Sequence, residues 1–160
     1  MELTAFDQHC FRRAVDLAEQ AEGAGNLPIG AVISLDGIII AEGRNAIWRP
    51  EPDPNRHAEV EALRALPAHH RTSARRMTLY TTLEPCLMCL GDILLHRIGR
   101  VLYGAADFYG GASRVFGHMP AYFEQEVART QWFGPADAQH CDPLFARVMV
   151  LLEQNGEGWE

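Results

Sequence analysis

The chain has 160 residues, which is enough for one domain with a core large enough to be stable by itself. Hydrophobic residues make up 48% of it, but the longest apolar runs, such as residues 37–41, are far too short to cross a bilayer. The formal net charge is −7 and all 14 basic residues are arginines, which argues against binding to duplex nucleic acid and excludes Schiff-base lysine chemistry.

The first third of the chain predicts a helix followed by a hairpin. Residues 5–22 repeat apolar side chains at helical spacing, and glycines at 23 and 25 end the pattern. Two apolar runs, 31–34 and 38–41, then flank Leu35-Asp36-Gly37, and Asp-Gly between apolar runs is typical of a hairpin turn. A proline-rich loop over residues 48–55 leads to a helix near 57–66.

The rest of the chain alternates strands and helices. We expect strands over 77–82, 100–105 and 127–132, and helices over 85–97 and 138–153. The basic cluster Arg71, Arg75 and Arg76 lies between a predicted helix and a predicted strand, where we expect a solvated loop. The order of elements indicates a single α/β domain over residues 1–160, with helices on both faces of a sheet.

Two cysteines at the start of a predicted helix form the first part of a candidate metal site. Pro85 is favoured in a first helical turn, which places Cys86 and Cys89 on one face of the helix. The N–H groups and dipole at a helix N-terminus lower thiol pKa values and so favour metal-binding thiolates. A thioredoxin-like redox pair shares this spacing, but no companion motif for it occurs, and it leaves the His57-x-Glu59 pair unexplained.

His57 and Glu59 complete the predicted site. The 29 positions from His57 to Cys86 accommodate one helix and one strand, so two helix N-termini can meet at one end of the sheet. His57, Cys86 and Cys89 would leave the fourth position of a tetrahedral zinc ion to water, with the Glu59 carboxylate beside it. That arrangement is typical of a hydrolytic zinc site.

Two alternatives stay open on the residues alone. One is a structural zinc site closed by Cys10, His140 or Cys141, which would leave no position for water. The other is a catalytically silent zinc-binding scaffold, although a scaffold has no need of the Glu59 carboxylate.

The two motifs together resemble the zinc-dependent cytidine deaminase-like superfamily, whose signature is H-x-E followed by P-C-x-x-C. Segments 27–31, 81–86 and 97–101 resemble the branch that holds bacterial tRNA adenosine deaminases, guanine deaminases and fungal-type cytosine deaminases. The resemblance implies a three-layer α/β/α sandwich around a five-stranded mixed sheet, and commonly a dimer. It also implies Zn²⁺ as the cofactor, bound by His57, Cys86 and Cys89, with Glu59 as the proton shuttle.

The resemblance further implies a set of substrate contacts. Asn45 matches a position that hydrogen-bonds the substrate ring, and backbone groups near Ala58 and at the Pro85–Cys86 junction would face the reacting centre. The segment over residues 106–113 departs from the tRNA-type version of the family in its two aromatic residues. We expect Asp107 to contact substrate, and the candidate stacking or tail contacts are Trp48, Phe108, Tyr109, Glu157, Trp159 and Glu160.

The sequence therefore predicts a zinc-dependent aminohydrolase that removes the exocyclic amine of a small nucleobase-like heterocycle and releases ammonia. A free base or nucleoside of guanine or cytosine type is favoured, because a tRNA enzyme is expected to offer a basic surface and a cationic C-terminal helix. A tRNA-specific adenosine deaminase, which converts wobble A to I, is the alternative. Cysteine usage and a polar N-terminus predict a cytoplasmic location, and we expect a homodimer without a membrane partner.

Overall fold

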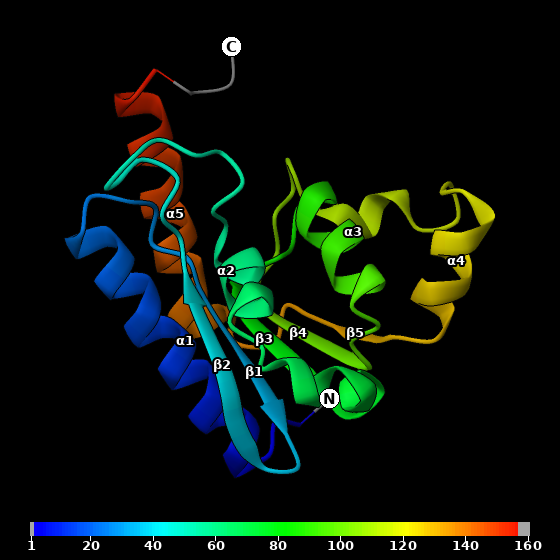
Figure 1. Ribbon diagram of the computed structural model, residues 1–160. Helices are drawn as coiled ribbons and strands as arrows, with labels where there is room; N and C mark the ends of the chain where they lie inside the picture. Colours follow the sequence, from blue (N-terminus) through cyan, green and yellow to red (C-terminus); the bar gives the residue numbers. More distant parts are fainter. Residues whose placement is uncertain (1, 157–160) are drawn as a thin grey trace.

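Five strands form a mixed sheet in the computed structural model, which describes residues 2–156 (Figure 1). Their order is β2-β1-β3-β4-β5, with β1 antiparallel to β2 and β3, and with β3, β4 and β5 parallel. The strands are β1 (Gly30–Leu35), β2 (Ile38–Arg44), β3 (Thr78–Leu83), β4 (Arg100–Ala105) and β5 (Gln131–Phe133). The predicted five-stranded mixed sheet is confirmed.

Helices cover both faces of this sheet and complete the three-layer sandwich. Helices α1 (Ala5–Gly23) and α5 (Ala138–Gln154) lie together on one face, and α2 (Ala58–Arg64) and α3 (Leu87–Leu95) lie on the other. Helix α4 (Ala121–Ala128) packs against α3. Within residues 2–156, none of the helices combines the length and apolarity that a membrane span requires.

Four short elements differ from the sequence predictions. The predicted solvated loop around the arginine cluster is instead the 3-10 helix η1 (Ala68–Arg76), in which Arg75 pairs with the buried Glu126 and Arg76 pairs with Asp36. The last strand covers only 131–133, because α4 takes up the residues before it. Helix α4 and a second 3-10 helix, η2 (Ala112–Val115), were not predicted.

Two glycines let the first two helices approach the sheet closely. A Cβ atom on Gly30 would lie 2.1 Å from the Ala14 carbonyl oxygen of α1, and one on Gly43 would lie 2.1 Å from the Ala58 carbonyl oxygen of α2. The predicted hairpin turn between β1 and β2 is present, with positive φ at both Asp36 and Gly37. The start of α2 is therefore fixed directly against the backbone of β2.

The sheet is buried on both faces, as an α/β sandwich requires. Successive residues of β3 enter different clusters, with Leu79 beside Leu63 of α2 and Ile93 of α3, and Tyr80 beside Phe11 of α1. All five side chains are at most 1% exposed. Alternate side chains of β3 therefore anchor the helices of opposite layers.

A buried carboxylate ties α1 to the sheet. Asp7 is 2% exposed and accepts hydrogen bonds from Thr4, from the Tyr80 hydroxyl at 2.8 Å and from the Arg100 guanidinium at 2.9 Å. Burial alone would raise the pKa of Asp7, but these hydrogen bonds outweigh it and lower the pKa to about 2.

The Asp7→Asn variant is expected to lose about 2 kcal/mol of stability at neutral pH, because each pKa unit corresponds to about 1.4 kcal/mol. The depressed pKa stabilises the fold above the ordinary aspartate value of 3.8, and this contribution is lost as pH falls towards about 2. Urea unfolding between neutral and acidic pH measures the effect, and the difference between variant and wild type should shrink as the pH falls. A difference that is independent of pH would contradict this account of Asp7.

Candidate metal centre and active site

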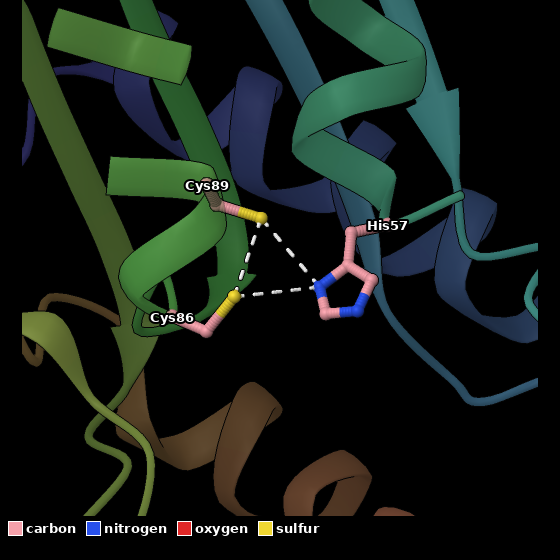
Figure 2. Close-up of side chains that lie close together, drawn as sticks. All are labelled: His57, Cys86 and Cys89. Carbon is pink, nitrogen blue, oxygen red and sulfur yellow. Dashed lines mark hydrogen bonds between the residues drawn. The ribbon is translucent and has the colours of Figure 1, made fainter. Parts of the chain in front are cut away.

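The predicted ligands come from two helix N-termini that meet at one end of the sheet (Figure 2). His57 is the N-cap residue of α2, Cys86 is the N-cap residue of α3, and Cys89 lies in the first turns of α3. Neither N-cap side chain makes a capping hydrogen bond, and both residues have extended backbone. Their side chains therefore leave the helix ends and point towards each other.

The spacing of the three ligand atoms fits a tetrahedral zinc ion. His57 Nδ1 lies 3.6 Å from Cys86 Sγ and 3.5 Å from Cys89 Sγ, and the two sulfurs are 3.7 Å apart. With Zn–S bonds of about 2.3 Å and Zn–N bonds of about 2.05 Å, tetrahedral angles give edges of about 3.6 Å for N···S and about 3.8 Å for S···S. The donor set of one imidazole and two thiols is also one that zinc takes.

A closed structural zinc site would need a fourth protein ligand, and no further metal-ligating side chain joins the group in the described part of the chain. His57, Cys86 and Cys89 are the one group of metal-ligating side chains that come together among residues 2–156. Cys10 instead packs with the cluster around Tyr80, and Cys141 lies against Gly104. A centre with three protein ligands therefore keeps one coordination position for a small molecule.

The two cysteine sulfurs of the centre lie 3.7 Å apart and shift each other's pKa in opposite directions. The interaction with Cys89, together with the neighbouring His57, lowers the pKa of Cys86 to about 4. The interaction with Cys86, together with burial, raises the pKa of Cys89. Zinc binds cysteine as thiolate, so a thiol proton that remains is released when the metal binds.

Glu59 lies beside the ligands without being one of them. Its side chain is 4% exposed, Oε1 accepts a hydrogen bond from the Thr81 hydroxyl at 3.0 Å, and Oε2 lies 3.4 Å from Cys89 Sγ. Burial raises the pKa of the Glu59 carboxyl above its ordinary value. A buried carboxyl with a raised pKa holds an accepted proton more readily than an exposed one does, as a group that carries protons requires.

A cavity of about 280 Å³ is lined by the candidate ligands His57 and Cys86 and by Glu59. Its polar wall includes Glu84 and Asp107. Its other walls are mainly apolar, and the C-terminal half of α5 supplies one of them through Phe145, Val148, Met149 and Leu152. The four α5 residues show helical spacing in the sequence, but nothing there indicates that they face a site rather than the core.

Glu84 holds the loop that carries Asp107. Its carboxylate accepts hydrogen bonds from the Asp107 N–H at 3.0 Å, the Ser113 N–H at 3.2 Å and the Ser113 hydroxyl. Asp107 in turn accepts the N–H groups of Tyr109 and Gly110, both at 2.9 Å. Glu84 and Thr81 lie at the site but were not predicted to act in it, because neither hydrogen bond can be read from sequence spacing.

The other predicted substrate residues divide into two groups. Asn45, Ala58 and Pro85 are buried, and the Asn45 Oδ1 accepts the Ile47 N–H, while its buried Nδ2 has no partner within residues 2–156. Phe108 is 74% exposed and is not among the described residues that line the cavity.

The remaining candidate contacts lie elsewhere or outside the described residues. Trp48 lines a separate hollow near the C-terminal end of α5, whereas Tyr109 lines the cavity. Glu157, Trp159 and Glu160 fall outside residues 2–156.

An α/β/α sandwich with a His/Cys/Cys centre and a buried glutamate beside it defines a cytidine deaminase-like protein, and zinc is the cofactor that this fold takes. The comparison with family models agrees, since the MafB19-like deaminase model matches residues 6–127. The chain belongs to the MafB19-like deaminase family.

The relatives and solved structures include two kinds of deaminase that bear on the substrate. The tRNA-specific adenosine deaminase of Haemophilus influenzae is 46% identical over 110 residues, covering 67% of this chain and 62% of that protein. The chain thus spans less than two thirds of the length of this relative. Among solved structures, a tRNA:A34 deaminase has a TM-score of 0.67 and 30% identity, covering 86% of this chain and 99% of that one. The guanine deaminase of Bacillus subtilis has a TM-score of 0.57 and 33% identity, covering 91% and 94%.

Cys86→Ala should reduce bound zinc from one ion per chain to nearly none, because two remaining ligands hold zinc poorly. Elemental analysis of protein purified without chelator measures the occupancy. Cys10→Ala is the matched control, since it removes a buried thiol outside the centre and should keep the zinc. Full occupancy in Cys86→Ala would show that the ion lies elsewhere.

Proposed function

We propose that the protein is a zinc-dependent hydrolytic deaminase of a free nucleobase or nucleoside. The observation that carries the proposal is the buried Glu59 carboxylate beside a three-ligand centre at one end of a small, mainly apolar cavity. Cavities for drug-sized ligands measure about 300–1,000 Å³, so this cavity of about 280 Å³ suits one heterocycle.

The proposed reaction exchanges an amine for an oxygen on the ring. The water oxygen replaces the exocyclic amine at the ring carbon, one water proton leaves with the amine as ammonia, and the other proton stays on the product ring. A zinc ion held by His57, Cys86 and Cys89 would supply a Lewis acid that lowers the pKa of water towards neutrality.

Glu59 performs the proton transfers in this proposal. Its carboxylate accepts a proton from water, passes it to the ring nitrogen and assists the departure of the amine. The apolar residues of α5 line one side of the cavity, where they limit the access of bulk water to the ring. Asn45 stays a proposed ring contact through its side chain, whose buried Nδ2 has no partner within residues 2–156, but it lines a different hollow, together with Arg44 and Arg49.

The charges around the cavity favour a neutral substrate with N–H groups. Glu59, Glu84 and Asp107 line the cavity, and its described lining includes no arginine. Carboxylates accept hydrogen bonds from ring N–H and amine groups but repel phosphate. A base or nucleoside of guanine or cytosine type therefore suits the cavity better than a nucleotide.

A tRNA-specific adenosine deaminase remains the second candidate, and two observations favour it. Relatives with that activity in their names share 46% and 40% of aligned residues with this chain. A hollow beside β2 also gathers four arginines, which are Arg13, Arg44, Arg49 and Arg56. Two of them are neutralised within the chain, because Arg13 pairs with Glu42 and Arg56 pairs with Glu61.

We retain the homodimer and the cytoplasmic location as proposals. Helix α3 leaves Leu87 and Leu95 each 60% exposed, an apolar face that a second copy could cover, and light scattering would test this.

The free thiols of all four cysteines support the proposed location, because a reducing compartment keeps cysteines in that form.

Glu59→Gln should keep zinc and fold but lose turnover by about 100- to 10,000-fold, the usual contribution of a positioned proton carrier. The amide preserves the volume of the buried side chain but cannot take up the proton. Ammonia release measures the rate, and elemental analysis checks the metal. A variant that retains a tenth of the wild-type rate would remove Glu59 from the proposed role.

Salt dependence separates the two substrate classes. With a free base or nucleoside, kcat/KM should change less than about threefold between roughly 50 and 200 mM salt, because no phosphate is bound. Recognition through about six phosphates would instead weaken binding about a thousandfold over that range.

The matched variant for this experiment is the double substitution Arg44→Ala and Arg49→Ala. It should leave base or nucleoside turnover unchanged, because neither residue lines the cavity. Efficient deamination of a tRNA anticodon stem-loop, which is lost in this variant or at high salt, would establish the second candidate instead.

A further inference from the structure

We infer that Thr81 is a positioning residue that holds the Glu59 carboxylate in the orientation needed for proton transfer. The inference rests on the proposed deaminase function. Thr81 lies in the middle of β3 and is 0% exposed, and its hydroxyl donates to Glu59 Oε1 at 3.0 Å.

The location of Thr81 makes it a rigid support. Its backbone pairs with Ala31 of β1 on one side and with Tyr103 of β4 on the other, so it lies in the interior of the five-stranded sheet. Glu59 instead lies in the first turn of a helix of only 7 residues. The hydrogen bond therefore links the end of a short helix to the interior of the sheet, where the backbone is paired on both sides.

The two carboxylate oxygens of Glu59 have different partners. Oε1 accepts the Thr81 hydroxyl, and Oε2 lies 3.4 Å from Cys89 Sγ. A zinc-bound Cys89 is a thiolate and has no proton to donate. The Thr81 hydroxyl is then the side-chain donor that still holds the carboxylate, which leaves Oε2 as the oxygen available for proton transfer.

The adjacent residue offers an internal comparison. Thr82 is 1% exposed and also uses its hydroxyl, which accepts the Gly30 N–H at 3.2 Å. Because side chains alternate along a strand, Thr82 points to the face opposite Thr81 and away from Glu59. The two threonines therefore share residue type, strand and burial but differ in their relation to the site.

The test compares Thr81→Val, Thr81→Ser and Thr82→Val in the full chain. Valine keeps the shape of threonine and removes the hydroxyl, so Thr81→Val should lower kcat by about 10- to 100-fold, because the carboxylate is no longer held in place. KM and zinc content should change little, and Thr81→Ser should recover most of kcat. Thr82→Val should lower the melting temperature but leave kcat near the wild-type value.

Thr81→Val with wild-type kcat, or Thr82→Val with the same loss of kcat, would overturn the inference. Crystal structures of zinc-loaded wild type and Thr81→Val give a readout that is independent of turnover. We expect the Glu59 carboxylate to be rotated or in several orientations in the variant, and an unchanged carboxylate would also overturn the inference. A wild-type protein that releases no ammonia from any base, nucleoside or tRNA would overturn the proposed function alone.

Discussion

The site depends on the meeting of two helix N-termini at one end of the sheet. Helix α2 begins just after His57, and helix α3 begins just after Cys86. Gly43 allows α2 to lie against the backbone of β2, and α3 follows directly from the end of β3. Because the sheet positions both helices, the three candidate ligand atoms lie at three corners of one tetrahedron.

The same arrangement explains how the fold tolerates a buried acid next to two thiols. Burial disfavours an ionised carboxylate, so an isolated buried glutamate would be neutral and costly to charge. Glu59 has a hydroxyl donor from β3 and lies at a helix N-terminus, where the helix dipole stabilises negative charge. These two contributions oppose the burial, which leaves a carboxyl that can change protonation state during a reaction.

Sequence reasoning identified the layers and the His57, Cys86 and Cys89 cluster that could hold a metal, because both depend largely on local patterns. Strand and helix periodicity, the Asp36-Gly37 turn and the spacing of Cys86 and Cys89 are all short-range signals. Helix α4 was not predicted, although Pro120 directly before it and Glu124 in its first turn are typical of a helix start. The hydrogen bonds of Thr81 and Glu84 were also missed, because each joins residues more than twenty positions apart through side-chain geometry that no spacing encodes.

The cavity wall formed by α5 is a second feature that the sequence pattern could not predict. Phe145 and Val148 have the spacing of an ordinary amphipathic helix, and the sequence supports packing on the sheet equally well. Only the fold reveals that residues of α5 line the same cavity as His57 and Cys86.

Opposite charges lie on two sides of the segment that joins β2 to α2, and they bear on different substrates. Ile47 and His57 line the acidic cavity, whereas Arg44, Arg49 and Arg56 from the same stretch line the hollow beside β2. A small heterocycle would contact only the first group, and a nucleic acid would have to use the second as well. Charge neutralisation within the hollow reduces its attraction for phosphate, since Arg56 already pairs with Glu61 at 2.8 Å. The described lining of the acidic cavity includes no arginine, and this asymmetry supports the neutral, N–H-bearing ring that we propose as substrate.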